Sequence, residues 1–242
     1  MKKVVLALLI ISFVGYFSCG ILIPSENYLF FKPWITPLIF IYFYTPKHYN
    51  FTIHFLLLFI FIYIGELCFS LYNIAYFTEV GVVAYFFSYS ILAYLGLSRL
   101  KTSIYQGFTT VYLILVFLIS AVYLYKLVVI IQDDDQTSLF TEYFVYLNAL
   151  AALTLIVVAG RYIYQYNDLK SILYFLIALG FIMSDVISAI VTYYYNSFTL
   201  NLFDRIFHYL AVFLIYFYMI SEHDTKSLSV QEQLKALDED AR

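Results

Sequence analysis

The chain has 242 residues, of which 64% are hydrophobic, 22% aromatic and 12% charged, with a formal net charge of −3. A soluble domain carries about 25% charged residues, so lipid must be the solvent for most of this chain. The slightly acidic balance offers no electrostatic basis for binding nucleic acid, which excludes that class of partner. The two cysteines lie in apolar segments, with neither disulfide nor metal-ligand spacing.

Apolar segments of membrane length recur along the chain and are separated by short polar breaks. The first segment has the basic start of a signal peptide, but its apolar run continues to Pro24, so we expect it to be a membrane helix. The second is the shortest and contains Pro33 and Pro37, which predict a kinked or re-entrant start. The predicted spans are 4–23, 29–46, 51–72, 77–98, 104–131, 141–161, 171–195 and 202–221.

The sequence therefore predicts an all-α fold, a polytopic transmembrane bundle of eight helices over residues 1–221. With the N-terminus in the cytoplasm, ten of the 13 basic residues fall on the cytoplasmic side and three outside, in agreement with the positive-inside rule. The even number of spans then places both termini in the cytoplasm. Residues 222–242 are polar and mixed in charge, and we expect a solvated cytoplasmic tail. The expected location is the cytoplasmic (inner) membrane of a bacterium.

Ionisable residues inside membrane spans are costly, and they usually face the interior of the bundle. In the predicted topology Asp185 lies about 22 Å along the seventh helix, toward the outer leaflet. Glu66 in the third helix lies at a similar depth. The ends of neighbouring helices bring four more ionisable residues to this level: Lys32, Glu79, Arg205 and His208. The sequence thus predicts one polar layer on the outer side of the bundle.

Small and polar residues at helical spacing flank both Asp185 and Glu66, which indicates that the two carboxylates face other helices. One interpretation is a buried ion-pair network that holds the bundle together, with Lys32 and Arg205 as counter-ions. The convergence of six groups favours the other interpretation, a polar cavity. His208 is then a candidate proton carrier, although a single histidine near a helix end is more often a packing residue. No ligand spacing predicts a metal, and no motif predicts a cofactor.

The order of these motifs resembles that of the YhhN, or lysoplasmalogenase-like, family of eight-helix membrane proteins. The matching segments are "FFKPWITPLIFIY", "FIYIGELCFSLYN", "GVVAYFFSYSILAYL", "LGFIMSDVISAI" and "HYLAVFLIYFYMI". Lys32-Pro33 and Ser184-Asp185 match the family pattern, and Gly65-Glu66 matches with an acid one methylene longer. The chain departs from the pattern at Ser88-Tyr89, where the family has Ala-His, and at Val212, where it has Gln.

The resemblance implies a hydrolase that cleaves the vinyl ether bond of lysoplasmalogens, releasing a fatty aldehyde and a glycerophospho head group. Glu66 and Asp185 would be the acid/base pair, because this chemistry needs one carboxyl to donate a proton and one carboxylate to activate water. The implied substrate contacts are Lys32 and Arg205 for the phosphate, Tyr89 as an orienting hydroxyl, and Ser184 and His208. The alternative is a non-catalytic or proton-coupled protein that binds or transports lipids or small molecules, although the halves of the chain show no internal repeat.

Overall fold

Helices joined by short turns make up the residues that the computed structural model of the chain describes, and no strand occurs among them. The all-α prediction is therefore confirmed for this part of the chain. Most of the predicted span 104–131 lies outside it. The described residues are 2–22, 31–44, 52–71, 76–100, 115, 117–119, 121–122, 139–193, 195 and 197–240.

Five of the helices are long and apolar enough to cross a membrane, namely α3, α4, α6, α7 and α8. This agrees with a membrane-embedded chain, while the predicted number of spans and their orientation stay predictions. The helices are α1 (Lys2–Leu22), α2 (Lys32–Tyr44), α3 (Ile53–Ser70), α4 (Phe77–Leu97), α6 (Leu139–Tyr166), α7 (Leu169–Tyr193) and α8 (Phe198–Asp240).

Helix α2 is short, and its sequence explains where it begins. It has 13 residues, so it extends about 20 Å, less than the thickness of a hydrocarbon core of about 30 Å. Pro33 is its second residue, where the missing N–H removes no intrahelical hydrogen bond. Pro37 lies inside the helix, where its ring weakens the bonding of the preceding turn.

The connection between α6 and α7 is tighter than the sequence predicts, because α6 continues to Tyr166 and α7 begins at Leu169. Asn167 has a φ of 46°, a left-handed conformation that asparagine tolerates. Asp168 and Ser171 cap α7 reciprocally: the Ser171 N–H donates to Asp168 Oδ1 at 2.8 Å, and the Asp168 N–H donates to Ser171 Oγ at 3.0 Å. This pairing satisfies two N–H groups at the start of α7.

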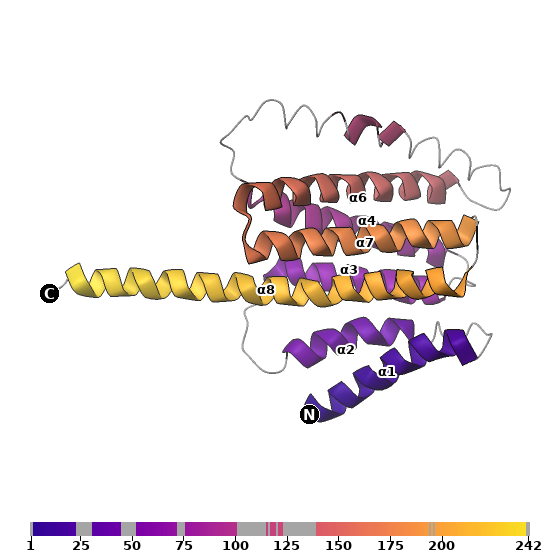
Figure 1. Ribbon diagram of the computed structural model, residues 1–242, viewed down its shortest axis with the longest axis horizontal. Helices are drawn as coiled ribbons and strands as arrows, with labels where there is room; N and C mark the ends of the chain where they lie inside the picture. Colours follow the sequence, from indigo (N-terminus) through magenta and orange to yellow (C-terminus); the bar gives the residue numbers. More distant parts are fainter. Residues whose placement is uncertain are drawn as a thin grey trace.

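Helix α8 does not end at the membrane boundary expected near residue 221 but continues to Asp240. Its C-terminal part extends beyond the rest of the bundle (Figure 1). Residues 222–240 contain neither glycine nor proline, and 11 of these 19 residues are Glu, Gln, Lys, Leu or Ala, which are good helix formers. The change from apolar to polar residues after Ser221 therefore does not end the helix.

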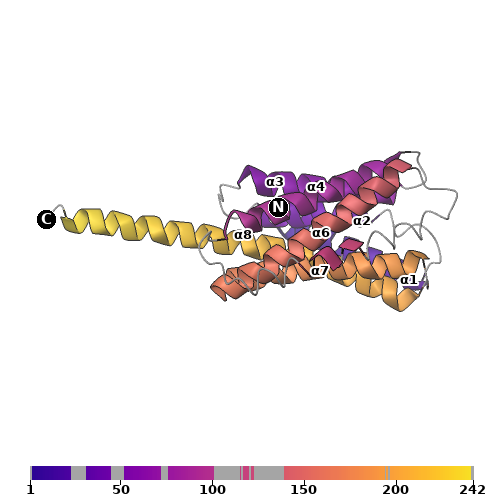
Figure 2. The ribbon, with the colours of Figure 1, turned by 90° about the horizontal axis from the view of Figure 1, so that it is seen from above.

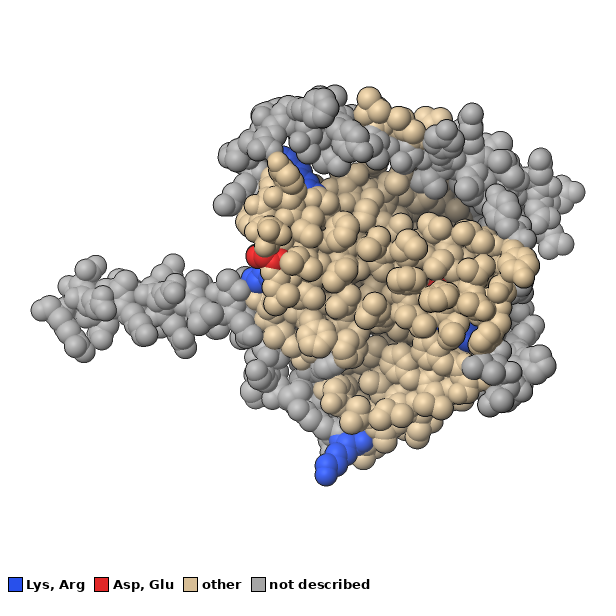
Figure 3. Space-filling view, viewed as in Figure 1, with Lys and Arg blue, Asp and Glu red and all other residues tan. Residues whose placement is uncertain are grey.

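The five long helices form the body of the molecule, in which α4 contacts α3 and α6, and α7 contacts α6 and α8. Helix α2 packs against α3 and α8, and α1 packs mainly against α2 (Figures 1 and 2). One face of the molecule carries few charged side chains (Figure 3), as a lipid-facing surface requires.

Helices α7 and α8 pack closely because Gly180 has no side chain. A Cβ at this position would meet the Cβ of Ala211 at 3.0 Å and the carbonyl oxygen of Phe207 at 3.2 Å. Small residues at such contacts allow two membrane helices to approach each other. The contact lies one turn from Ser184 and Asp185, so it positions these two side chains against α8.

Candidate functional site

Glu66 is the most deeply buried charged residue among those described, with 0% of its surface exposed. Its Oε1 accepts a hydrogen bond from the Thr36 hydroxyl of α2 at 2.8 Å and lies 2.9 Å from His208 Nε2 of α8. No described residue donates to Oε2. A buried carboxylate requires such partners because it has lost its hydration. Glu66 therefore joins α3 to both α2 and α8.

Gly65, next to Glu66, allows α4 to pack closely against α3. A Cβ on Gly65 would meet the ring of Tyr85 at 3.0 Å, so glycine allows α4 to place that ring directly against α3. The ring of Tyr85 lies 6.2 Å from that of His208 in an edge-on arrangement. Helices α3, α4 and α8 thus meet around the Glu66 carboxylate.

Asp185 lies on the inner face of α7, yet it remains exposed. Tyr174, Ala178 and Phe181 precede it at intervals of three or four residues and are no more than 1% exposed, so they mark the face that α7 turns toward the bundle. Tyr89 of α4, 1% exposed, donates its hydroxyl to Asp185 Oδ2 at 2.7 Å. The inner face of α7 therefore becomes accessible at Asp185, where a carboxylate is held in place by a buried tyrosine.

His208 interacts with both carboxylates. Its Nε2 faces Glu66, and Asp185 interacts with it electrostatically. Aromatic rings enclose the imidazole edge-on, with centroids 5.5 Å away for Phe181 and 5.2 Å away for Tyr209. The side chain of His208 is 11% exposed, against 0% for Glu66.

A second polar contact links α7 to α8 beside this group. The Ser184 hydroxyl donates to Asp204 Oδ1, and Ser184 is 4% exposed. Asp204 also interacts electrostatically with Asp185. Ser184 therefore satisfies one carboxylate of α8, while the adjacent Asp185 is satisfied by α4.

The two cations that the sequence assigns to a phosphate have different surroundings. Lys32, the first residue of α2, is partly buried and interacts electrostatically with Asp185. Arg205 is 6% exposed, donates from Nη1 to the Tyr16 carbonyl at 3.0 Å, and lies 4.6 Å from the centroid of the Tyr16 ring. Glu66 pairs with His208, whose Nε2 lies 2.9 Å from Oε1. Arg205 thus fastens α1 to α8, and Lys32 acts on Asp185 through its charge.

A layer of buried apolar side chains lies inside the bundle, between the polar group and the end that contains Arg99 and Lys170. The layer consists of side chains that are at most 2% exposed: Leu58, Ile62, Leu92, Ile177 and Ile215. Beyond it the Tyr174 hydroxyl donates to the Leu92 carbonyl at 2.6 Å, and the Tyr166 hydroxyl donates to the Arg99 carbonyl at 2.7 Å.

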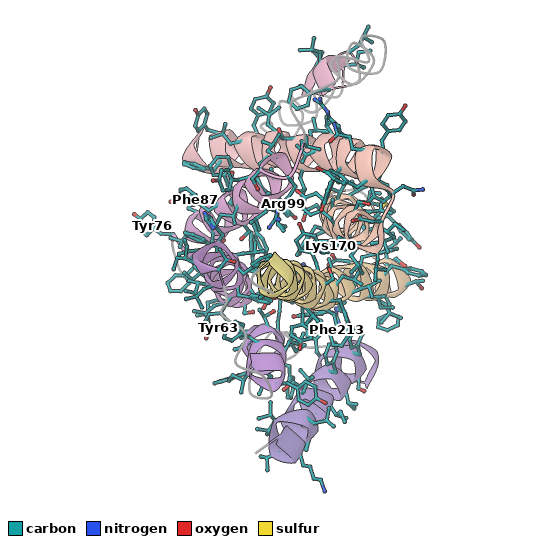
Figure 4. All side chains as sticks on the ribbon, turned by 90° about the vertical axis from the view of Figure 1, so that its left-hand side faces the viewer. Tyr63, Tyr76, Phe87, Arg99, Lys170 and Phe213 are labelled. Atoms are coloured by element: carbon teal, nitrogen blue, oxygen red, sulfur yellow. The ribbon has the colours of Figure 1, made fainter. Side chains whose placement is uncertain are left out.

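The end of the bundle beyond this apolar layer is seen in Figure 4. In this view along the bundle Arg99 and Lys170 lie on the inner side of the helices, whereas Tyr76 and Phe87 lie on the outside (Figure 4). The rings of Tyr162 and Tyr218 pack against that of Tyr174, at centroid distances of 5.5 and 5.7 Å. Aromatic side chains thus pack inside the bundle at this end.

The structure brings together most of the residues that the sequence singled out. They are Glu66, Asp185, Lys32, Tyr89, Ser184 and His208, with Arg205 turned toward α1. Glu79 lies in the first turn of α4, about 9 Å along the helix from Tyr85 and about 15 Å from Tyr89.

Four further residues belong to the group but were not assigned to the site from the sequence. They are Tyr16, Thr36, Tyr85 and Asp204. Helical spacing holds a signal for three of them: Thr36 follows Lys32 by four residues, and Tyr85 and Asp204 precede Tyr89 and His208 by four. Tyr16 contributes a backbone carbonyl and a ring face, for which the sequence holds no signal.

Among the described residues, no cluster of three or more His, Cys, Asp or Glu side chains could hold a metal ion. No family model, curated protein or solved structure matches the chain. What can be said of function therefore depends on the geometry of the site.

Proposed function

We propose that this chain is a YhhN-like, lysoplasmalogenase-type hydrolase that cleaves the vinyl ether bond of a single-chain ether lipid. One observation carries the proposal: an accessible carboxylate, Asp185, lies beside a buried Glu66–His208 pair within a membrane bundle. Two acid/base groups with different access to water are what the hydrolysis of an acid-labile bond needs.

The chemistry requires one group that donates a proton and one that accepts a proton from water. In the first step a proton adds to the β-carbon of the vinyl ether, a C–H bond forms, the C=C π bond breaks, and an oxocarbenium ion results. Water then adds to the α-carbon as Asp185 takes one of its protons, which gives a hemiacetal. In the last step the hemiacetal C–O bond to glycerol breaks, its hydroxyl proton leaves and the glycerol oxygen gains a proton. The products are an aldehyde and an alcohol.

The substrate class follows from the surroundings of Asp185. The outer surface of the helices is apolar, and the inner face of α7 becomes accessible at this residue, so a lipid with one chain can reach the carboxylate from the bilayer. Lys32 would contact the phosphate, because it lies within electrostatic range of Asp185 and the residue is partly exposed. Arg205, engaged with Tyr16, would support this end of the site.

Proton-coupled transport is the second interpretation of buried carboxylates, and the apolar layer weighs against it. A transport path needs polar groups or water along the whole bundle. Leu58, Ile62 and Ile215, each 0% exposed, lie between the polar group and the opposite end. A site open on one side fits hydrolysis or binding better than passage through the bundle.

The topology that belongs to this proposal has eight spans with both termini in the cytoplasm of a bacterial cell. It is supported by the distribution of the 13 basic residues. In that topology Asp185 and Glu66 lie toward the outer leaflet.

Aldehyde release from a synthetic lysoplasmalogen by the purified protein in liposomes tests the function. We expect release by the unaltered chain and a loss of at least about 100-fold in Asp185→Asn, since acid/base groups contribute about 10²–10⁴-fold. Asp168→Asn is the matched control, because Asp168 caps the other end of α7 and asparagine also caps helices. No release from folded protein, or equal release by the two variants, would refute the proposal.

A further inference from the structure

We propose that His208 is the catalytic residue that exchanges protons with the substrate, and that Glu66 is a positioning residue acting through it. The inference rests on the proposed function and reassigns one half of its acid/base pair. It follows from three observations: the accessibility of each group, the sharing of one Glu66 oxygen, and the location of the free imidazole nitrogen.

Accessibility separates the two residues first. Glu66 is 0% exposed, and its side chain retains no surface that a water molecule could touch. A vinyl ether carbon could not come within proton-transfer distance of it unless the bundle opened. The side chain of His208 is 11% exposed. Of the two partners, the imidazole is the one that a substrate can reach.

The hydrogen bonds of Glu66 then orient the imidazole. Oε1 already accepts from the Thr36 hydroxyl, and the same oxygen lies 2.9 Å from His208 Nε2. If this oxygen accepts from both Thr36 and His208, then Nε2 carries the hydrogen of the neutral imidazole ring. Fixing a tautomer by a hydrogen bond on the other ring nitrogen is how carboxylates serve catalytic histidines. Glu66 and Thr36 thus act as an orienting pair on the buried side of the ring.

The remaining nitrogen, Nδ1, has no hydrogen-bond partner among the described residues. The ring also interacts electrostatically with Asp185, so the second acid/base group of the proposed reaction lies beside it. The charged and titratable groups around His208 come from several helices: Lys32 of α2, Glu66 of α3, Tyr85 of α4, Asp185 of α7, and Asp204 and Tyr209 of α8. Lys32 contributes a cation to this group, and Arg205 lies three residues before His208 on α8.

A closed proton cycle follows from this arrangement. The imidazolium donates its Nδ1 proton to the β-carbon of the vinyl ether while Glu66 balances the positive charge. Asp185 takes a proton from the attacking water. His208 Nδ1 then removes the hydroxyl proton of the hemiacetal, and Asp185 returns its proton to the departing glycerol oxygen. Both groups end in their starting protonation states, and one water is consumed per bond cleaved.

The first test is chemical rescue. We expect His208→Ala to lower aldehyde release by about 10²–10⁴-fold. Added imidazole should then raise the activity of this variant at least about tenfold. Asp185→Asn is the matched control, since it keeps His208 and should gain nothing from imidazole. Glu66→Gln should lose activity without rescue. Full activity in folded His208→Ala, or equal rescue of both variants, would overturn the proposal.

The second test does not require turnover. The chain has four histidines, so ¹⁵N-histidine labelling, with His208→Gln for assignment, gives a spectrum in which the ring nitrogens of His208 can be identified. At alkaline pH we expect the Nε2-protonated tautomer in the unaltered chain and a mixture of tautomers in Glu66→Gln, because an amide can donate as well as accept. An Nδ1-protonated ring in the unaltered chain would overturn the proposal.

The two tests separate the possible failures. Absence of aldehyde release from the unaltered, folded chain would refute the proposed hydrolase function and, with it, the catalytic role of His208. Release that persists in folded His208→Ala would refute the role of His208 alone.

Discussion

Replacing Tyr89 by phenylalanine separates function from stability at the candidate site. The change removes one hydroxyl, which donates to Asp185 Oδ2 at 2.7 Å, and leaves a ring that is 1% exposed in its place. A hydrogen bond to a charged acceptor contributes about 1.5–3 kcal/mol. Asp185 is exposed, however, so water can replace the lost donor, and we expect the free energy of unfolding to fall by about 1 kcal/mol or less.

Activity should fall further than stability. Without the tyrosine the carboxylate can rotate away from its position, and a displacement of about 1 Å can cost about 100-fold in rate. We expect aldehyde release in Tyr89→Phe to fall by about 10- to 100-fold, while the midpoint of thermal unfolding falls by less than about 4 °C. Aldehyde release and thermal unfolding are measured on the same preparation in detergent.

Tyr174→Phe is the matched control, with the opposite expected pattern. The Tyr174 hydroxyl donates to the Leu92 carbonyl at 2.6 Å, and the residue is 1% exposed, so water cannot replace it. We expect the free energy of unfolding to fall by about 1–3 kcal/mol. Aldehyde release should change less than threefold, which corresponds to roughly 0.6 kcal/mol of activation free energy. The reasoning would be refuted by full activity in Tyr89→Phe, or by a greater loss of activity in Tyr174→Phe.

Two further changes test how the bundle is assembled. Thr36→Val should lower the free energy of unfolding by about 1–3 kcal/mol, because Glu66 Oε1 loses a buried donor; Thr36→Ser keeps the hydroxyl and should lose less, and equal losses in thermal unfolding would contradict this role. Gly180→Ala should cost about 1–3 kcal/mol, since the new Cβ meets Ala211 at 3.0 Å. Gly160→Ala, where nothing lies within 4 Å, should leave stability unchanged or raise it by up to about 1 kcal/mol, and a larger loss there would contradict the packing argument.

The helical class and the membrane character could be predicted because they depend on local properties of the chain. Composition and the spacing of apolar residues are read one segment at a time, and five helices have the required length and hydropathy. Helix ends were harder to predict. The polar residues after Ser221 suggested that the helix stops, but without glycine or proline the backbone continues to Asp240.

The residue types of the candidate site could also be predicted. Carboxylates are rare in membrane spans, so Glu66 and Asp185 stand out in the sequence, and topology brings them to one level. Arg205 shows where this kind of prediction ends. One of its contacts, the hydrogen bond from Nη1 to the carbonyl of Tyr16 in α1, is made to a backbone group for which the sequence gives no signal.

The apolar helical character of the chain, and the presence of two carboxylates, Glu66 and Asp185, within apolar segments, follow from the sequence alone. The pairing of the polar groups depends on the three-dimensional structure: Thr36 and His208 with Glu66, across 30 and 142 residues, and Tyr89 with Asp185, across 96. The tertiary structure also decided that Asp185 is accessible while Glu66 is fully enclosed. The physical reason is that helical periodicity fixes the face on which a side chain lies, whereas its partners and its exposure depend on the rotation and close approach of neighbouring helices.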